Sequence, residues 1–111
     1  MAKVDEALRR LTIGDPVLLG QLSERREKVA PAPHLDARTE SLLRIAALIA
    51  LDAPASSYRA EVATAQLHGA RLEDLLATLY AVAATVGSAR LVSAAPRIAL
   101  ASGYDVEAAL E

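Results

Sequence analysis

The stretch from Ala77 to Gly87, "ATLYAVAATVG", restricts the fold of this chain more than any other segment. It consists almost entirely of small and apolar residues, and Tyr80 is its only bulky aromatic side chain. Alanine-rich segments favour helix, so a helix is predicted from Leu72 to Val86. A helix that is apolar on every side must be buried on every side. We therefore expect this helix to be central, or to be shared with another subunit.

The composition extends this argument to the whole chain. Hydrophobic residues make up 53% of the 111 residues, alanine and leucine dominate among them, and aromatic residues are only 3%. Both dominant residues favour helix, so the predicted fold class is all-α, with six to seven helices. The length fits a single domain over residues 1–111, with N-terminal helices and a loop in 1–34 and a core in 35–103. So short a chain cannot bury all of this apolar surface, which favours an oligomer.

Helix-capping and helix-breaking residues divide the chain into segments. Asp15 followed by Pro16 is typical of a helix start, and Asp36 can cap the helix that follows the proline loop. Gly69 is placed as a C-terminal stop, while Pro96 predicts a kink or break in its helix. Helices are expected at 1–11, from 16 onwards, and at 37–51, 54–68, 72–86, 88–101 and 106–111.

Several classes of partner are disfavoured by charge and composition. The net charge is −2 with both signs mixed, and no basic block or aromatic run suits nucleic acid. The apolar stretches are shorter than the roughly 20 residues that span a bilayer, and the start does not resemble a signal peptide. The chain has no cysteine, which removes disulfides and thiol chemistry and is compatible with a cytoplasmic location. Two histidines without cysteine make no ligand set, so we expect no metal and no cofactor.

One polar stripe interrupts the apolar pattern of the predicted helix at 54–68. Ser57, Glu61, Thr64 and His68 follow one another at steps of four, three and four, which places them on one helix face. Such a stripe is either a solvated surface or the wall of a site. As a site, it would bind a substrate through Ser57 and Thr64, together with Tyr58, which lies off the stripe. Tyr58 also fits the core, with its hydroxyl hydrogen-bonded.

Glu61 and His68 are the candidate catalytic residues of this stripe. A carboxylate tuned by burial can act as a general acid or base, although most helical glutamates are simply solvated. Histidine titrates near neutral pH and can carry protons, but His68 beside Gly69 also suits a plain helix C-terminus. The two residues lie two turns apart, about 10 Å along the axis, so only a ligand could touch both.

The pattern of helices resembles the carboxymuconolactone decarboxylase family, which includes the AhpD-like alkylhydroperoxidases. The resemblance is carried by "LDARTESLLRIAALIAL", "EVATAQLHGARLEDLLATLYAVAATVG" and "GSARLVSAAPRIALASG", which together cover Leu35 to Gly103. It implies an AhpD-like helical bundle that assembles as a homotrimer or homohexamer. It also implies a pocket between helices near a subunit contact.

The chain departs from this family at the residues that carry its chemistry. In the peroxidase branch, CxxC and a histidine four residues later precede "HGA"; here those positions fall near Pro54 and Ser57 and on Glu61. The family's glutamate in the preceding helix aligns with Ser41, and Glu40 is one residue off. Thiol peroxidase activity is excluded, because the thiolate is the attacking group. The decarboxylase branch keeps the histidine that Glu61 replaces.

Two functions follow from the sequence. The first is cofactor-free acid/base chemistry by Glu61, of the lyase, isomerase or decarboxylase type, on a small carbonyl or lactone substrate. The second is a non-catalytic relative that serves as an oligomeric scaffold or binds a small ligand. Loss of the cysteines and the histidine favours the second function. The titratable group retained on a polar stripe favours the first.

Overall fold

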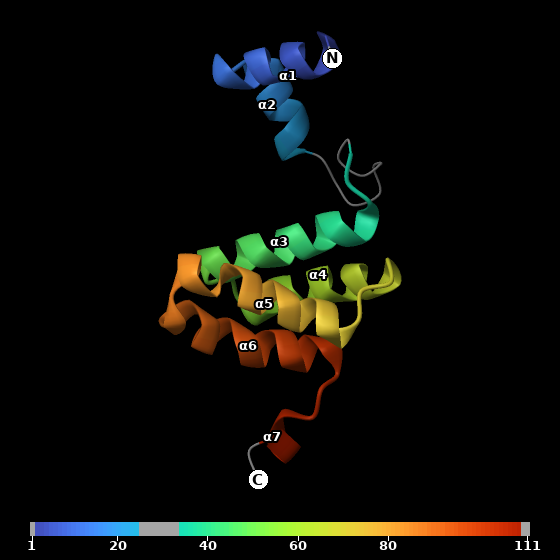
Figure 1. Cartoon of the computed structure of the whole chain (residues 1–111), viewed down its shortest axis with the longest axis vertical. Coiled ribbons are helices and arrows are strands. Elements are labelled where there is room, and N and C mark those ends of the chain that lie inside the picture. Colours follow the sequence, from blue (N-terminus) through green and yellow to red (C-terminus); the bar gives the residue numbers. More distant parts are fainter. Residues whose placement is uncertain (1, 25–33, 110–111) are drawn as a thin grey trace. The chain divides into compact units, whose positions relative to one another are not determined.

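The computed structural model describes residues 2–24 and 34–109, which belong to two compact units, 1–30 and 31–111 (Figure 1). The described residues contain seven helices and no strand, which confirms the all-α prediction. The prediction of one domain over 1–111 stays a prediction, and the proline loop lies partly outside the described residues. Among those residues, no helix has the length and apolar character needed to cross a membrane.

The first unit contains α1 (Ala2–Thr12) and α2 (Pro16–Ser23). Asp15 starts α2 as predicted, because its Oδ1 accepts a hydrogen bond from the Val17 amide at 2.9 Å. Its Oδ2 accepts from Arg10 Nε at 2.7 Å. The bond from Arg10 lowers the pKa of Asp15, and the amides of the first turn of α2 add to this effect. A charged cap therefore fixes the turn between the two helices.

The second unit is built on four helices, α3 (Ala37–Leu51), α4 (Ala55–Leu67), α5 (Leu72–Val86) and α6 (Ser88–Ser102), followed by the short α7 (Val106–Ala109). Both α3 and α6 pack against α4 and against α5, and they also contact each other. Figure 1 shows these four helices stacked closely, with short connections between consecutive helices. This arrangement brings Glu61, on the predicted polar stripe of α4, next to α3.

The core of this unit lies where the four helices meet. Ile45 and Ile49 lie one turn apart on α3, so they form a continuous apolar ridge, and both are fully buried. They pack in one cluster with residues of the other three helices. The largest fully buried side chains are Tyr58, Ile45, Ile49, Leu75, Val62 and Ser41. The core is thus small and mostly aliphatic.

The expectation that α5 is central and buried on every side is wrong for the single chain. Only Leu75 and Thr78 of this helix are buried, and Tyr80 is 75% exposed. The reason is that, of the described helices, only α3 and α6 pack against α5, and two neighbours cannot cover a whole helix. The apolar sides left over remain as exposed surface, which leaves open the other expectation, a helix shared with another subunit.

The connections around α6 depend on two special residues. The predicted break at Pro96 does not occur, since α6 continues through it from Ser88 to Ser102. Ala94 and Ile98 on either side of Pro96 are buried, and their packing holds the helix together.

Gly87 alone separates α5 from α6 and has φ +86°, a region that other L-residues rarely adopt. No atom lies within 4 Å of the Cβ that a larger residue would add there, so the constraint at Gly87 is conformational rather than steric.

Asp52 ties the end of α3 to α6, and it makes the fold sensitive to acid. Its Oδ1 accepts a hydrogen bond from Ser93 at 2.6 Å and lies 3.4 Å from Arg97 Nη1. The bond from Ser93 is the main cause that lowers the pKa of Asp52 below its ordinary value of 3.8, and Arg97 and Arg90 contribute. A lowered pKa means that the charged carboxylate stabilises the folded state above the unfolded pKa. That stabilisation disappears as the pH falls through the folded pKa.

We therefore expect the Tm to fall more steeply below about pH 4 in the wild type than in Asp52→Asn. Asparagine keeps an acceptor for Ser93, removes the charge, and tolerates the left-handed conformation of position 52, where φ is +52°. The measurement is thermal unfolding followed by circular dichroism at pH 6 and pH 3. Equal losses of Tm in the two proteins would contradict this role of Asp52.

Candidate functional site

The polar stripe on α4 is partly buried and partly exposed. Ser57, Glu61 and Thr64 are largely sheltered from solvent, whereas His68 at the end of the helix is exposed. Thr64 Oγ1 donates to the carbonyl of Ala60 at 3.1 Å, so the hydroxyl hydrogen is used within the helix. The stripe therefore runs from a sheltered part of α4 to open solvent at the end of the helix.

Glu61 belongs to an ion cluster that joins α3 and α4. Arg44 Nη1 lies 3.4 Å from Glu61 Oε1, and Arg44 Nη2 lies 3.1 Å from Glu40 Oε1. The side chains of Glu40 and Glu61 are only 11% and 13% exposed. One guanidinium thus pairs with two nearly buried carboxylates, and each of its two amino groups contacts one of them.

Arg44 is not among the predicted site residues, although the sequence contains a signal for part of its role. Glu40 and Arg44 are four residues apart on one helix, the spacing at which opposite charges pair. Arg44 and Glu61 are 17 residues apart in the sequence, so their contact arises only when α3 and α4 pack together. The cluster gives Glu61 a fixed position and an attractive positive charge, which stabilises the carboxylate anion.

Tyr58 lies in the core as predicted, but its hydroxyl does not have the expected partner. The side chain is fully buried, and neither Tyr58 Oη nor Ser41 Oγ forms a hydrogen bond with a described residue. Burial raises the pKa of the Tyr58 hydroxyl, while Arg97 lowers it and Asp52 raises it. The expected hydrogen bond of Tyr58 is therefore wrong for the part of the chain that the structure describes, because the packing that buries the ring places none of those residues to pair with its hydroxyl.

His68 ends α4 and takes part in its capping through the backbone. Its amide hydrogen-bonds the carbonyls of Thr64 and Ala65 at 3.2 and 3.1 Å, and Gly69 follows with φ +89°. This is the helix-terminus role considered for His68, and its proton-carrying role stays a prediction. Among the described residues, no group of three or more histidine, aspartate or glutamate side chains is placed to hold a metal ion.

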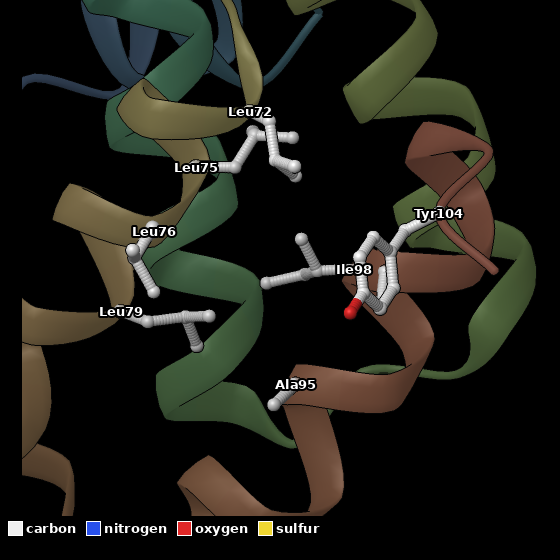
Figure 2. Close-up of a pocket in the computed structure, with 8 residues that line it drawn as sticks. Leu72, Leu75, Leu76, Leu79, Ala95, Ile98 and Tyr104 are labelled. Atoms are coloured by element: carbon white, nitrogen blue, oxygen red, sulfur yellow. The ribbon is translucent and has the colours of Figure 1, made fainter. Parts of the chain in front are cut away.

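A separate, apolar site lies between α5 and α6 (Figure 2). This pocket has a volume of about 340 Å³, and Figure 2 shows leucines of α5 facing Ala95 and Ile98 of α6. Tyr104 closes one side, because Gly103 in the left-handed conformation ends α6 and the Tyr104 amide bonds back to Ala99 O at 3.0 Å. Its lining residues are Leu72, Leu75, Leu76, Leu79, Ala95, Ile98, Ala99 and Tyr104.

A second hollow of about 440 Å³ continues this pocket along the same two helices. It shares Leu76, Leu79 and Ala95 with the first pocket and adds Tyr80, Ala83 and Leu91. We call the combined lining of the two hollows the α5–α6 face. The tyrosine hydroxyls are the only polar side-chain groups on this face, and it carries no charged side chain.

No family model, no curated protein and no solved structure matches this chain.

Proposed function

We propose that this chain is a self-associating helical protein whose α5–α6 face binds the same face of a second copy. The proposal corresponds to the oligomeric scaffold considered from the sequence. It rests on one observation, the exposed apolar surface of this face, where Leu76 is 50% and Tyr80 is 75% exposed. Contiguous apolar surface of this kind in a small chain marks an interaction site.

The shape and chemistry of the face favour a copy of the same chain as its partner. In a two-fold interface the same patch lies on both sides, so the patch must complement itself. A face without charges meets no like-charge repulsion in such a pairing. It also combines a projecting side chain, Tyr80, with the hollow beside it, so that Tyr80 of each copy can fill the hollow of the other.

This pairing bears on the number of subunits. A two-fold contact requires an even number of copies, so of the trimer and hexamer implied by the resemblance it favours the hexamer. Light scattering coupled to size exclusion tests self-association directly. We expect a mass that is an even multiple of the 11.7 kDa chain. A monomeric mass at every concentration would overturn the proposal.

A second candidate function is cofactor-free proton transfer by Glu61 on a small carbonyl or lactone compound. The observation that favours it is the pair of nearly buried carboxylates, Glu40 and Glu61, held on Arg44. A carboxylate in a sheltered position is the usual form of a general base, provided that a substrate can reach it. The same cluster also serves as a structural tie between α3 and α4, and these two roles are separable by experiment.

Glu61→Gln separates them, because glutamine keeps the shape and removes the charge. If Glu61 is a general base, turnover of a lactone or carbonyl substrate by the wild type falls at least 100-fold in the variant. Hydrolysis, isomerisation and decarboxylation across a panel of small lactones and oxo acids are followed by proton NMR. Glu73→Gln, which changes a glutamate with a 76% exposed side chain, is the matched control. Turnover that survives in Glu61→Gln would exclude the catalytic role.

A further inference from the structure

A third pocket, between the start of α4 and the end of α6, differs from the α5–α6 face in carrying positive charge. It has a volume of about 330 Å³ and is lined by Ala55, Arg59, Arg97, Leu100 and Ala101. Ala55 and Arg59 lie one turn apart on α4, and Arg97 and Ala101 lie one turn apart on α6. Two facing helices therefore each contribute one arginine and at least one small apolar wall residue.

Arg97 is held in place by the end of α3. Its Nη1 donates to the carbonyl of Ala53 at 2.8 Å and lies 3.4 Å from Asp52 Oδ1. Its Nε and Nη2 form no hydrogen bond with any described residue. A guanidinium that is oriented at one nitrogen and open at the others is preorganised to bind a planar anion.

Arg59 supplies a second positive charge at the same pocket. It forms no ion pair with any described residue, so no described carboxylate neutralises its charge. The pocket also lies at the N-terminus of α4, where Pro54 provides no side-chain cap for the first amides. Helix N-termini attract anions through these amides and the helix dipole. Asp52 is the acidic residue that contacts Arg97, so Arg59, Arg97 and Asp52 together carry a net charge of +1.

We propose that this pocket binds the carboxylate of a small aliphatic acid between Arg59 and Arg97. The carboxylate accepts hydrogen bonds from the open nitrogens of the two guanidinium groups. Leu100, Ala55 and Ala101 surround the short hydrocarbon chain. The volume of the pocket lies at the lower end of the range for small-molecule sites, which restricts the ligand to a compact molecule.

Titration of the full-length protein with hexanoate, followed by ¹⁵N NMR, tests this proposal. We expect saturable shift changes at the amides around positions 55–59 and 97–101. Hexanamide has the same shape without the charge and should bind at least about tenfold more weakly. Inorganic phosphate carries charge without the aliphatic chain and should also bind more weakly than hexanoate. Equal binding of hexanoate and hexanamide, or tighter binding of phosphate, would overturn the proposal.

Arg59→Gln provides the matching variant, because Arg59 is exposed and its replacement leaves the core intact. Loss of one charged donor should weaken hexanoate binding about tenfold or more. Arg71→Gln is the control: it removes the same charge just before α5, where Arg71 has a 75% exposed side chain. Unchanged affinity in Arg59→Gln, or equal losses in both variants, would show that the arginine pocket is not the site. Neither outcome depends on self-association through the α5–α6 face.

Discussion

Replacing both Leu76 and Tyr80 by glutamate is expected to leave the protein monomeric under conditions in which the wild type is assembled. Both side chains lie on the α5–α6 face, and both are at least half exposed in the single chain. The fold of the monomer therefore tolerates the change. In a two-fold interface the substitutions would bring four carboxylates into an apolar contact. Burying charges without partners costs several kcal/mol, more than a small interface supplies.

The measurement is again the mass in solution, which should fall to that of the 11.7 kDa chain. Circular dichroism checks that the helical content is retained. The matched control replaces Leu51 and Leu67, which are 75% and 85% exposed and lie outside the α5–α6 face, by glutamate. An assembled double variant, or dissociation by the control pair as well, would exclude the α5–α6 face as the specific interface.

Ile49→Ala is expected to destabilise the second unit by about 2–5 kcal/mol. Ile49 is fully buried at the centre of the bundle, and its truncation leaves a cavity in a core that has few large side chains. A single domain has a total stability of about 5–15 kcal/mol, so this loss is a large share of it.

Urea unfolding followed by circular dichroism measures this loss as a lower midpoint. Leu51→Ala on the same helix is the control, because a 75% exposed leucine should change the free energy of unfolding by no more than about 0.5 kcal/mol. If the two variants have the same midpoint, the packing assigned to α3 is incorrect.

The helices themselves were predictable because their limits are set by local chemistry. The ranges 37–51 and 72–86 agree with α3 and α5, and Asp15 and Asp36 cap helices as expected. The start of α4 is shifted slightly, since Pro54 precedes its first turn instead of lying within it. Caps and stops depend on neighbouring residues alone, and the sequence displays those directly.

The arrangement of side chains around the candidate sites was less predictable, because it depends on how distant segments pack. The helical spacing placed Glu61 on a polar stripe, but it did not reveal that Arg44 would bridge Glu61 and Glu40. The apolar character of α5 was evident, yet its exposure follows from which helices cover it. Similarly, the facing positions of Arg59 and Arg97 follow from the packing of α4 on α6.

The single glycine between α5 and α6 has a consequence for how the α5–α6 face can evolve. The angle between the two helices depends on a backbone conformation at Gly87 that excludes larger L-residues whatever the space around it. The geometry of the α5–α6 face thus depends on one residue, Gly87. Changes at its exposed residues, such as Leu76 and Tyr80, can alter what the face binds without altering this turn, whereas Leu75 on the same face belongs to the buried core.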